Sequence, residues 1–347
     1  MRITHLIPLL VSAALTACGG GGGGESVNNT AILGIALDDP AAPTKLYVAN
    51  ADNQTIQNLN LSTLAVSTLA GGANSAGATN GTGTAARFRL PYAITRVSST
   101  EFYVADTYNH GIRKLTNAGV VTTLAGLLGT AGALDGAGTA ATFNTPKGIG
   151  NDGTYVYVAD TYNHTIRQVL ISSGAVTTMA GYAGTAGTAD GTGGAARFNS
   201  PFGVVATGGN LYVTDTGNNT IRKVTAAGVV STLAGTAGTS GSADGTGTSA
   251  TFNAPTAIAT DGTNLFVADT SNHTIRKIVI STGAVTTWAG TAGLSGSADG
   301  TGSAARFNVP IGLAIDTAGN LYVTDQNYTK VRKITSAGAV TTLAATF

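Results

Sequence analysis

The segment Tyr157-Val-Ala-Asp-Thr-Tyr-Asn-His-Thr-Ile-Arg167 decides the fold, because close copies of it recur along the chain. The pattern of its first four residues occurs six times in all, with final positions 56, 54, 55, 54 and 56 residues apart. The copies are Tyr47–Asn50, Tyr103–Asp106, Tyr157–Asp160, Tyr212–Asp215, Phe266–Asp269 and Tyr322–Asp325. A regular period of this length is typical of stacked supersecondary units, so one repetitive body is expected over residues 31–347.

Each repeat contains four short extended runs, which in one copy are residues 202–206, 211–215, 220–224 and 229–233. These runs are rich in β-branched and aromatic residues and are bounded by Gly, Asn, Asp or Thr. The composition agrees, because 49 glycines and only 10% charged residues do not suit surface helices. Four antiparallel strands per repeat make one propeller blade. The sequence therefore predicts an all-β, six-bladed β-propeller of four-stranded antiparallel blades.

The turn after each repeated phrase resembles the NHL repeat, which is named for its Asn-His-Leu core. The matching triplets, each followed by Ile-Arg, are Asn109-His110-Gly111, Asn163-His164-Thr165, Asn218-Asn219-Thr220 and Asn272-His273-Thr274. The resemblance covers all six units and implies a six-bladed propeller. The terminal repeats depart from the pattern, the first with Asn50 and Gln57 and the last with Gln326-Asn327-Tyr328. Whether a strand from one terminus completes the blade of the other is left open.

The amino terminus is expected to be a lipoprotein signal peptide over residues 1–17. Arg2 precedes an apolar run that is too short to span a bilayer as a permanent helix. Leu15-Thr16-Ala17-Cys18 resembles the lipobox of bacterial lipoproteins, which implies cleavage before Cys18 and acylation of its thiol. An ordinary secretory signal with an incidental Cys is the alternative. Residues 18–30 then form the lipidated Cys and a Gly-rich tether.

These features predict a monomer that is lipid-anchored in the cell envelope. Gly19, rather than Asp, follows the Cys, which favours the outer membrane of a Gram-negative bacterium by analogy with bacterial lipoproteins. Removal of the signal takes Arg2 away and leaves a formal net charge of zero. A neutral chain lacks the basic footprint of a nucleic-acid-binding protein, so nucleic acid is not expected as a partner.

Five of the repeated phrases end in an Asp that an Arg follows seven residues later. The pairs are Asp106 with Arg113, Asp160 with Arg167, Asp215 with Arg222, Asp269 with Arg276, and Asp325 with Arg332. An Asp at a strand end accepts bonds from the following turn, and an Arg on the returning strand neutralises it. We interpret these pairs as structural hairpin locks rather than as catalytic groups.

Long inserts separate the repeats, and each contains a Phe three residues ahead of a Pro. The Phe residues, Phe88, Phe143, Phe198, Phe252 and Phe307, are expected to anchor the inserts by burying their rings. Asp-Gly pairs at 135, 190, 244 and 299, with Asn80-Gly81 in the first insert, are interpreted as tight turns. Calcium is the competing interpretation, although one carboxylate per insert is few for that ion.

The inserts and the turns between second and third strands are expected on one face of the ring, where loops commonly carry recognition. The candidate ligand-binding residues on this face are Tyr108, His110, Tyr162, His164, His273, Tyr328, Arg87, Arg197 and Arg306. A metal site is not expected, because the three histidines belong to different blades. The predicted inner strands, 93–97, 148–151, 203–206, 257–260 and 312–315, contain no glutamate. An acid–base pair would therefore have to come from loops.

These observations predict a non-enzymatic binding or scaffold module of the bacterial cell envelope. Its partner would be an envelope or extracellular protein, peptide or glycan, recognised through the loop-bearing rim, and no cofactor is expected apart from the calcium alternative. A metal-dependent propeller hydrolase or lyase, similar to the lactonases or the amidating lyases, is the alternative function. A purely structural surface repeat is a third possibility.

Overall fold

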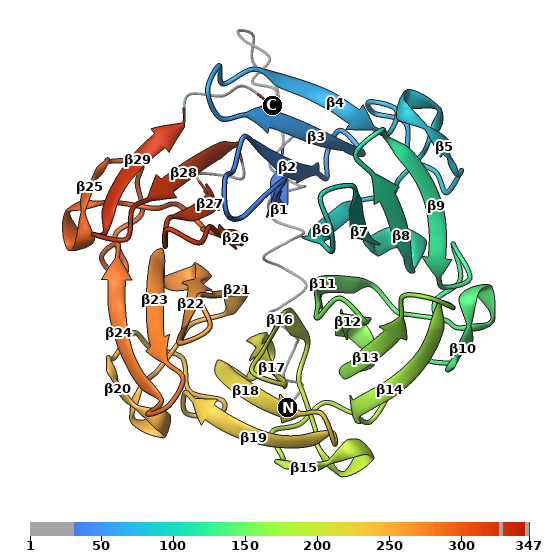
Figure 1. Cartoon of the computed structure of the whole chain (residues 1–347). Coiled ribbons are helices and arrows are strands. Elements are labelled where there is room, and N and C mark those ends of the chain that lie inside the picture. Colours follow the sequence, from blue (N-terminus) through green and yellow to red (C-terminus); the bar gives the residue numbers. More distant parts are fainter. Residues whose placement is uncertain (1–30, 326–328, 344–346) are drawn as a thin grey trace, which may run out of the picture.

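The structure is a computed structural model that describes residues 31–325, 329–343 and 347. Six antiparallel sheets follow one another around a ring with a central channel, and the chain colours run once around it in Figure 1. The prediction of an all-β, six-bladed propeller is confirmed. The predicted signal peptide, Cys18 and the tether lie outside the described residues.

In every blade the four long strands run in chain order from the channel to the perimeter. The innermost strands are β1 (Ile32–Leu37), β6 (Pro91–Arg96), β11 (Pro146–Asn151), β16 (Pro201–Thr207), β21 (Pro255–Thr260) and β26 (Gly312–Ile315). The second strands are β2 (Lys45–Asn50), β7 (Glu101–Asp106), β12 (Tyr155–Asp160), β17 (Asn210–Asp215), β22 (Asn264–Asp269) and β27 (Leu321–Asp325).

The returning strands complete each blade. The third strands are β3 (Thr55–Asn60), β8 (Gly111–Thr116), β13 (Thr165–Leu170), β18 (Thr220–Thr225), β23 (Thr274–Val279) and β28 (Lys330–Ile334). The fourth strands are β4 (Val66–Ala70), β9 (Val120–Ala125), β14 (Ala175–Gly181), β19 (Val229–Ala234), β24 (Ala284–Ala289) and β29 (Ala339–Leu343).

Each insert adds a two-residue strand to the outer edge of the blade that follows it, so blades 2 to 6 have five strands instead of the expected four. These strands are β5 (Gly81–Thr82), β10 (Gly136–Ala137), β15 (Gly191–Thr192), β20 (Gly245–Thr246) and β25 (Gly300–Thr301), and Figure 1 shows them at the perimeter. The expectation of tight Asp-Gly turns was wrong, because each of these glycines opens a strand and pairs with the blade edge.

A single 3₁₀ turn follows each short strand. These turns are η1 (Gly83–Ala85), η3 (Gly138–Ala140), η5 (Gly193–Ala195), η7 (Gly247–Ser249) and η9 (Gly302–Ala304). The part of the chain that the structure describes contains no helix with the length and apolar character needed to cross a membrane.

The hydrophobic cores lie between neighbouring blades rather than within one blade. The core between blades 1 and 2 combines Ala49 and Ile56 from the first with Phe102 and Val104 from the second. Phe88 of the intervening insert completes it and is fully buried. Since both faces of each sheet are buried in this way, the strands need not alternate between apolar and polar residues.

The ring closes by packing of blade 6 against blade 1, without exchange of a strand between them. The four long strands of each blade come from one continuous segment. Thr324 Oγ1 donates a hydrogen bond of 2.7 Å to the carbonyl of Leu33, and Tyr322 packs with Ile32 and Leu46. The sequence left open whether one terminus supplies a strand to the blade of the other. Within the described residues it does not.

Glycine lets the inner strands of neighbouring blades approach closely around the channel. A Cβ placed on Gly148 would lie 1.6 Å from the carbonyl oxygen of Phe202 in the next blade. At the ring closure, a Cβ on Gly312 would lie 2.1 Å from the carbonyl oxygen of Leu33. No side chain is tolerated at such distances, so only glycine at these positions allows the neighbouring strands to approach this closely.

Candidate binding face

Blade 4 illustrates how a buried ion pair holds each insert. Arg222 Nη1 lies 2.7 Å from Asp215 Oδ2, and both side chains are almost fully buried. The other guanidinium nitrogen lies 2.6 Å from Asp190 Oδ1 of the preceding insert. The guanidinium also covers the ring of Phe198, 5.2 Å from its centroid, and donates to the carbonyl of Arg197. One arginine therefore ties the hairpin to the insert.

The same arrangement recurs in all of blades 2 to 6. The Arg–Asp distances are 2.7 Å for Arg113–Asp106, 2.8 Å for Arg167–Asp160, 2.7 Å for Arg222–Asp215, 2.8 Å for Arg276–Asp269 and 3.1 Å for Arg332–Asp325. The insert oxygens that bind the second guanidinium nitrogen belong to Asn80, Asp135, Asp190, Asp244 and Asp299. These arginines and carboxylates therefore hold the hairpins and the inserts of the propeller together.

The protonation of the buried carboxylates follows from their surroundings. Burial raises the pKa of Asp106 to about 6, while Arg113, the backbone N–H of Arg89 and Asn109 act in the opposite direction. Burial likewise raises the pKa of Asp160, Asp215 and Asp269 to about 6. At neutral pH these carboxylates are ionised and neutralised by their arginines.

The three repeated histidines connect neighbouring blades. Each occupies a left-handed position, with φ between 55° and 59°, at the end of the turn between second and third strands. Their Nδ1 atoms accept backbone N–H bonds from the next blade, and these bonds are His110 to Thr145 at 3.1 Å, His164 to Ser200 at 3.0 Å, and His273 to Val309 at 3.2 Å. Asn219 plays the same part in blade 4, accepting from Ala254 at 2.8 Å.

These bonds stabilise a strained stretch of backbone. Thr145, Ser200 and Val309 precede prolines and have φ of 55°, 52° and 63°, a conformation that such residues rarely adopt. Burial lowers the pKa of His110, His164 and His273, which favours the neutral imidazole that can accept the bond. The histidines thus lie in separate blades, and each already uses one ring nitrogen.

The candidate arginines of the inserts remain within their own loops. Arg197 Nη1 donates to the carbonyl of Ala196 at 2.8 Å, and Arg306 Nη1 donates to the carbonyl of Ala305 at 2.7 Å. Arg87 makes the same bond to the carbonyl of Ala86 at 2.8 Å. The structure therefore does not bring these three residues together.

Tyr108 and Tyr162, by contrast, lie close together on what we call the loop-bearing face. This face carries the turns η2 (Thr107–Asn109), η4 (Thr161–Asn163), η6 (Thr216–Asn218) and η8 (Thr270–Asn272). The two tyrosines are 40% and 46% exposed, and burial together with the nearby Tyr108 raises the pKa of Tyr162. Gly217 and Ser271 take their places in blades 4 and 5. Tyr328 lies outside the described residues.

Lys147 is a candidate residue that sequence reasoning missed. It is the second residue of β11 and is only 8% exposed, and burial lowers its pKa to about 8. The predicted inner strand 148–151 began two residues later than β11 does, which left Lys147 out. The sequence did contain a signal for this residue. The residues that follow the five prolines are Tyr92, Lys147, Phe202, Thr256 and Ile311, and Lys147 is the charged one among them.

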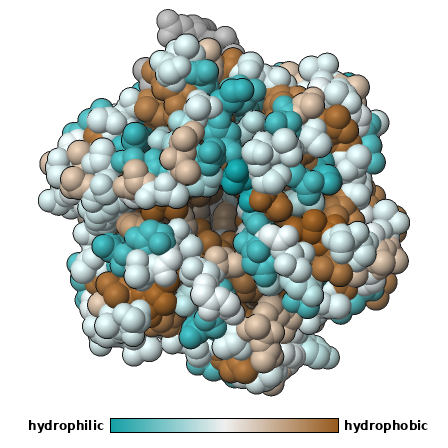
Figure 2. All heavy atoms as spheres, in the orientation of Figure 1, coloured by the Kyte–Doolittle hydropathy of each residue, from teal (hydrophilic) through white to brown (hydrophobic). Residues whose placement is uncertain are grey.

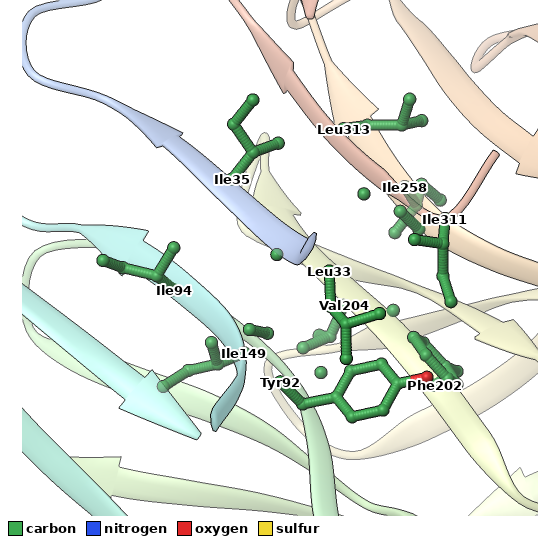
Figure 3. A pocket seen from close by; sticks show the side chains of 16 residues that line it. Leu33, Ile35, Tyr92, Ile94, Ile149, Phe202, Val204, Ile258, Ile311 and Leu313 are labelled. Carbon is green, nitrogen blue, oxygen red and sulfur yellow. The ribbon is translucent and has the colours of Figure 1, made fainter. Parts of the chain in front are cut away.

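The channel is narrow and apolar at the end that meets the loop-bearing face. Glycines and aliphatic side chains, among them Ile94, Ile149 and Val204, line a cavity of about 70 Å³ whose end is flanked by the rings of Tyr92 and Phe202 (Figure 3). A larger cavity of about 290 Å³ lies along the rest of the inner strands, and its lining includes the polar residues Thr95, Arg96, Asn151 and Thr260. Figure 2 shows the hollow at the centre of the ring with both apolar and hydrophilic residues around it. Within the described residues, no three His, Cys, Asp or Glu side chains are grouped as metal ligands.

The comparisons with known sequences agree with this architecture. The NHL repeat family model matches residues 198–224, from the anchoring Phe of one insert to the third strand of blade 4. NHL repeat-containing protein 2 of Homo sapiens is 36% identical over 148 residues, which are 39% of this chain and 20% of that protein. The chain therefore spans about a fifth of that curated relative. Fold and repeat together define a six-bladed β-propeller that contains an NHL repeat.

Solved structures share the fold at low sequence identity. A protein of unknown function from Bacteroides thetaiotaomicron has a TM-score of 0.67 and 18% identity, covering 93% of this chain and 73% of its own. An auxiliary nutrient binding protein from the same species has a TM-score of 0.65 and 16% identity, covering 90% and 69%. Virginiamycin B lyase from Staphylococcus aureus has a TM-score of 0.56 and 14% identity, covering 91% and 85%. At these identities the likeness concerns the fold alone.

Proposed function

We propose that the chain is a non-enzymatic binding module of the bacterial cell envelope. It recognises a protein, peptide or glycan through the part of the loop-bearing face that blades 2 and 3 form. Acylation of Cys18 anchors it to the outer membrane, and the Gly-rich tether separates the ring from the lipid.

One observation carries this proposal: the framework of the ring repeats, whereas the exposed aromatic residues do not. Tyr108 and Tyr162 stand in turns whose counterparts in blades 4 and 5 carry Gly217 and Ser271. Leu134 of the insert between blades 2 and 3 is also 66% exposed. Aromatic side chains held on a rigid scaffold provide contact area at low entropic cost. The similar fold of an auxiliary nutrient binding protein is compatible with such a role.

A cross-linking experiment on the full chain tests the proposal. Wild-type protein, the double variant Tyr108→Ala with Tyr162→Ala, and the control variant Ser271→Ala are cross-linked in envelope extract, and the attached peptides and glycans are identified. We expect the wild type and the control to recover the same species, and the double variant to lose them. Recovery of the same species by all three proteins would contradict the proposal.

The anchor is tested separately by Cys18→Ala. We expect this variant to leave the membrane fraction and to appear as soluble protein, because a single acylated Cys is the proposed attachment. A variant that stays in the membrane fraction would contradict acylation, without affecting the proposed binding face.

A further inference from the structure

Six residues at or next to the starts of the inner strands form a ring around the end of the channel that meets the loop-bearing face. Blades 1 to 6 contribute Leu33, Tyr92, Lys147, Phe202, Thr256 and Ile311, and all six side chains are buried. Lys147 is the one side chain in this ring that carries a positive charge. A single cation among apolar neighbours is costly unless something neutralises it.

Three aromatic rings surround the Lys147 ammonium. Its Nζ atom lies 5.5 Å from the ring centroid of Tyr92, 5.4 Å from that of Phe202 and 5.7 Å from that of Tyr162. Tyr92 and Phe202 meet edge to face, with centroids 5.1 Å apart, and both also line the channel cavity (Figure 3). Tyr162 instead belongs to the loop-bearing face. The ammonium therefore lies between the channel and that face.

The aromatic rings attract the charge but cannot accept its three N–H bonds. Within the described residues, no ion pair and no hydrogen bond is formed by the Lys147 ammonium, and burial lowers its pKa to about 8. Thr256, the other polar aliphatic residue of the ring, differs, because its hydroxyl bonds to Thr270 at 2.6 Å. The ammonium thus has donors available for a ligand.

The surrounding charges favour an anion. The repeated carboxylates of blades 2 and 3, Asp106 and Asp160, form buried ion pairs with Arg113 and Arg167. A second cation, Arg89, lies over the ring of Tyr108 at 6.0 Å and forms no ion pair within the part of the chain described. Two cations and two tyrosines therefore share this side of the face, with no free acidic side chain between them.

We propose that Lys147 binds the carboxylate of a ligand whose aromatic or apolar part lies against Tyr108 and Tyr162. The inference rests on the proposed function and gives its ligand a chemical class. The ammonium supplies one positive charge and a few donors, which match a carboxylate. A phosphate group carries nearly two negative charges, which a single ammonium neutralises only in part. The carboxylate can belong to a small aromatic acid or to the C-terminus of a peptide.

Calorimetric titration of the full chain tests this site. The probes are phenylacetate, its neutral analogue phenylacetamide, and the peptide Ala-Ala-Phe with a free or an amidated C-terminus. The variants are Lys147→Met, which keeps the length of the side chain, and Lys114→Met as the control, because Lys114 is a partly exposed lysine paired with Glu101. Thermal melting of each variant verifies that it is folded.

We expect at least one of the two acids to bind, each neutral counterpart to bind at least tenfold more weakly, and Lys147→Met to weaken the acid at least tenfold. Lys114→Met should bind as the wild type does. Binding of phenylacetate alone identifies a small acid, and binding of the free peptide alone identifies a C-terminus. Equal binding of acid and amide, equal binding by Lys147→Met, or no binding of either acid would overturn the proposal. A cross-linking result that still depends on Tyr108 and Tyr162 would then leave the proposed function standing.

Discussion

Blade 1 and blades 2 to 6 share the same four long strands but differ in the pair that links the second strand to the third. In blade 1 the pair is neutral, and Asn50 Nδ2 donates to Gln57 Oε1 at 2.8 Å. In the other blades it is a buried Asp and Arg. Within the described residues, blade 1 also has no short fifth strand at its outer edge. The charged pair therefore accompanies the insert.

The difference between the neutral and the charged pairs indicates the role of the arginine in blades 2 to 6. A hairpin of this kind can be closed by two amides, so the charge is not required for the hairpin itself. In blades 2 to 6 the same guanidinium also reaches an oxygen of the insert and stacks on its Phe, as Arg222 does with Asp190 and Phe198. Five donors in a planar fork allow these contacts at once. The lock is therefore a device for fixing the inserts.

The largest expected effect comes from breaking one charged lock. Arg222→Met leaves Asp215 buried without its partner, which we expect to lower the free energy of unfolding by about 3–5 kcal/mol. Gln57→Met in blade 1 removes one neutral hydrogen bond and is expected to cost about 1 kcal/mol. Urea denaturation of the two variants measures both. Equal losses in the free energy of unfolding would mean that the charged and the neutral pair contribute equally to stability.

A smaller loss is expected when blade 4 is given the neutral pair of blade 1. The double variant Asp215→Asn with Arg222→Gln leaves no unpaired charge, so it should lose about 1–3 kcal/mol, less than Arg222→Met alone. The same urea experiment compares them. A double variant that is less stable than the single variant would contradict the hairpin role assigned to the amide pair.

A still smaller loss of stability is expected when Asp190, the residue of the insert that binds Arg222, is removed. Asp190 is 51% exposed, and its bond to Arg222 competes with water, so Asp190→Ala is expected to cost at most about 1 kcal/mol. Urea denaturation should register this small change, and the insert should become more sensitive to limited proteolysis. Unchanged proteolysis of residues 181–200 would show that Asp190 does not hold the insert.

The smallest effect concerns the hydrogen bond that His164 accepts from Ser200 of the next blade, and the pH dependence of that bond. Burial lowers the pKa of His164, so its contribution to stability is complete above about pH 6.5 and is lost as the pH falls below that value through the lowered pKa of the folded state. His164→Asn introduces the residue type that blade 4 has at Asn219, and it does not titrate. We expect the two proteins to be similar at pH 7.5 and the variant to be more stable at pH 5, by about 1 kcal/mol or less because the imidazole is half exposed. A wild-type protein that is more stable than the variant at pH 5 would contradict the role assigned to the His164 hydrogen bond.

The repetition of the sequence made the ring predictable, and the non-repeated residues are where prediction fell short. Six phrases ending at Asn50, Asp106 and their counterparts determine the number of blades, because each phrase is one second strand. The short strand at Gly191 was mistaken for a turn, since two residues carry no periodic pattern and their pairing depends on the next blade. Lys147 was missed because its aromatic neighbours come from three different repeats.

Hydrogen exchange of blade 4 tests most directly the claim that the charged lock fixes the insert. In the double variant Asp215→Asn with Arg222→Gln, we expect the bonded insert amides of Gly187, Gly193 and Arg197 to exchange faster. The amides of β17 and β18 should keep the protection they have in the wild type, because the neutral pair still closes the hairpin. Unchanged protection of the insert, or an equal loss of protection in the insert and in both strands, would contradict the account.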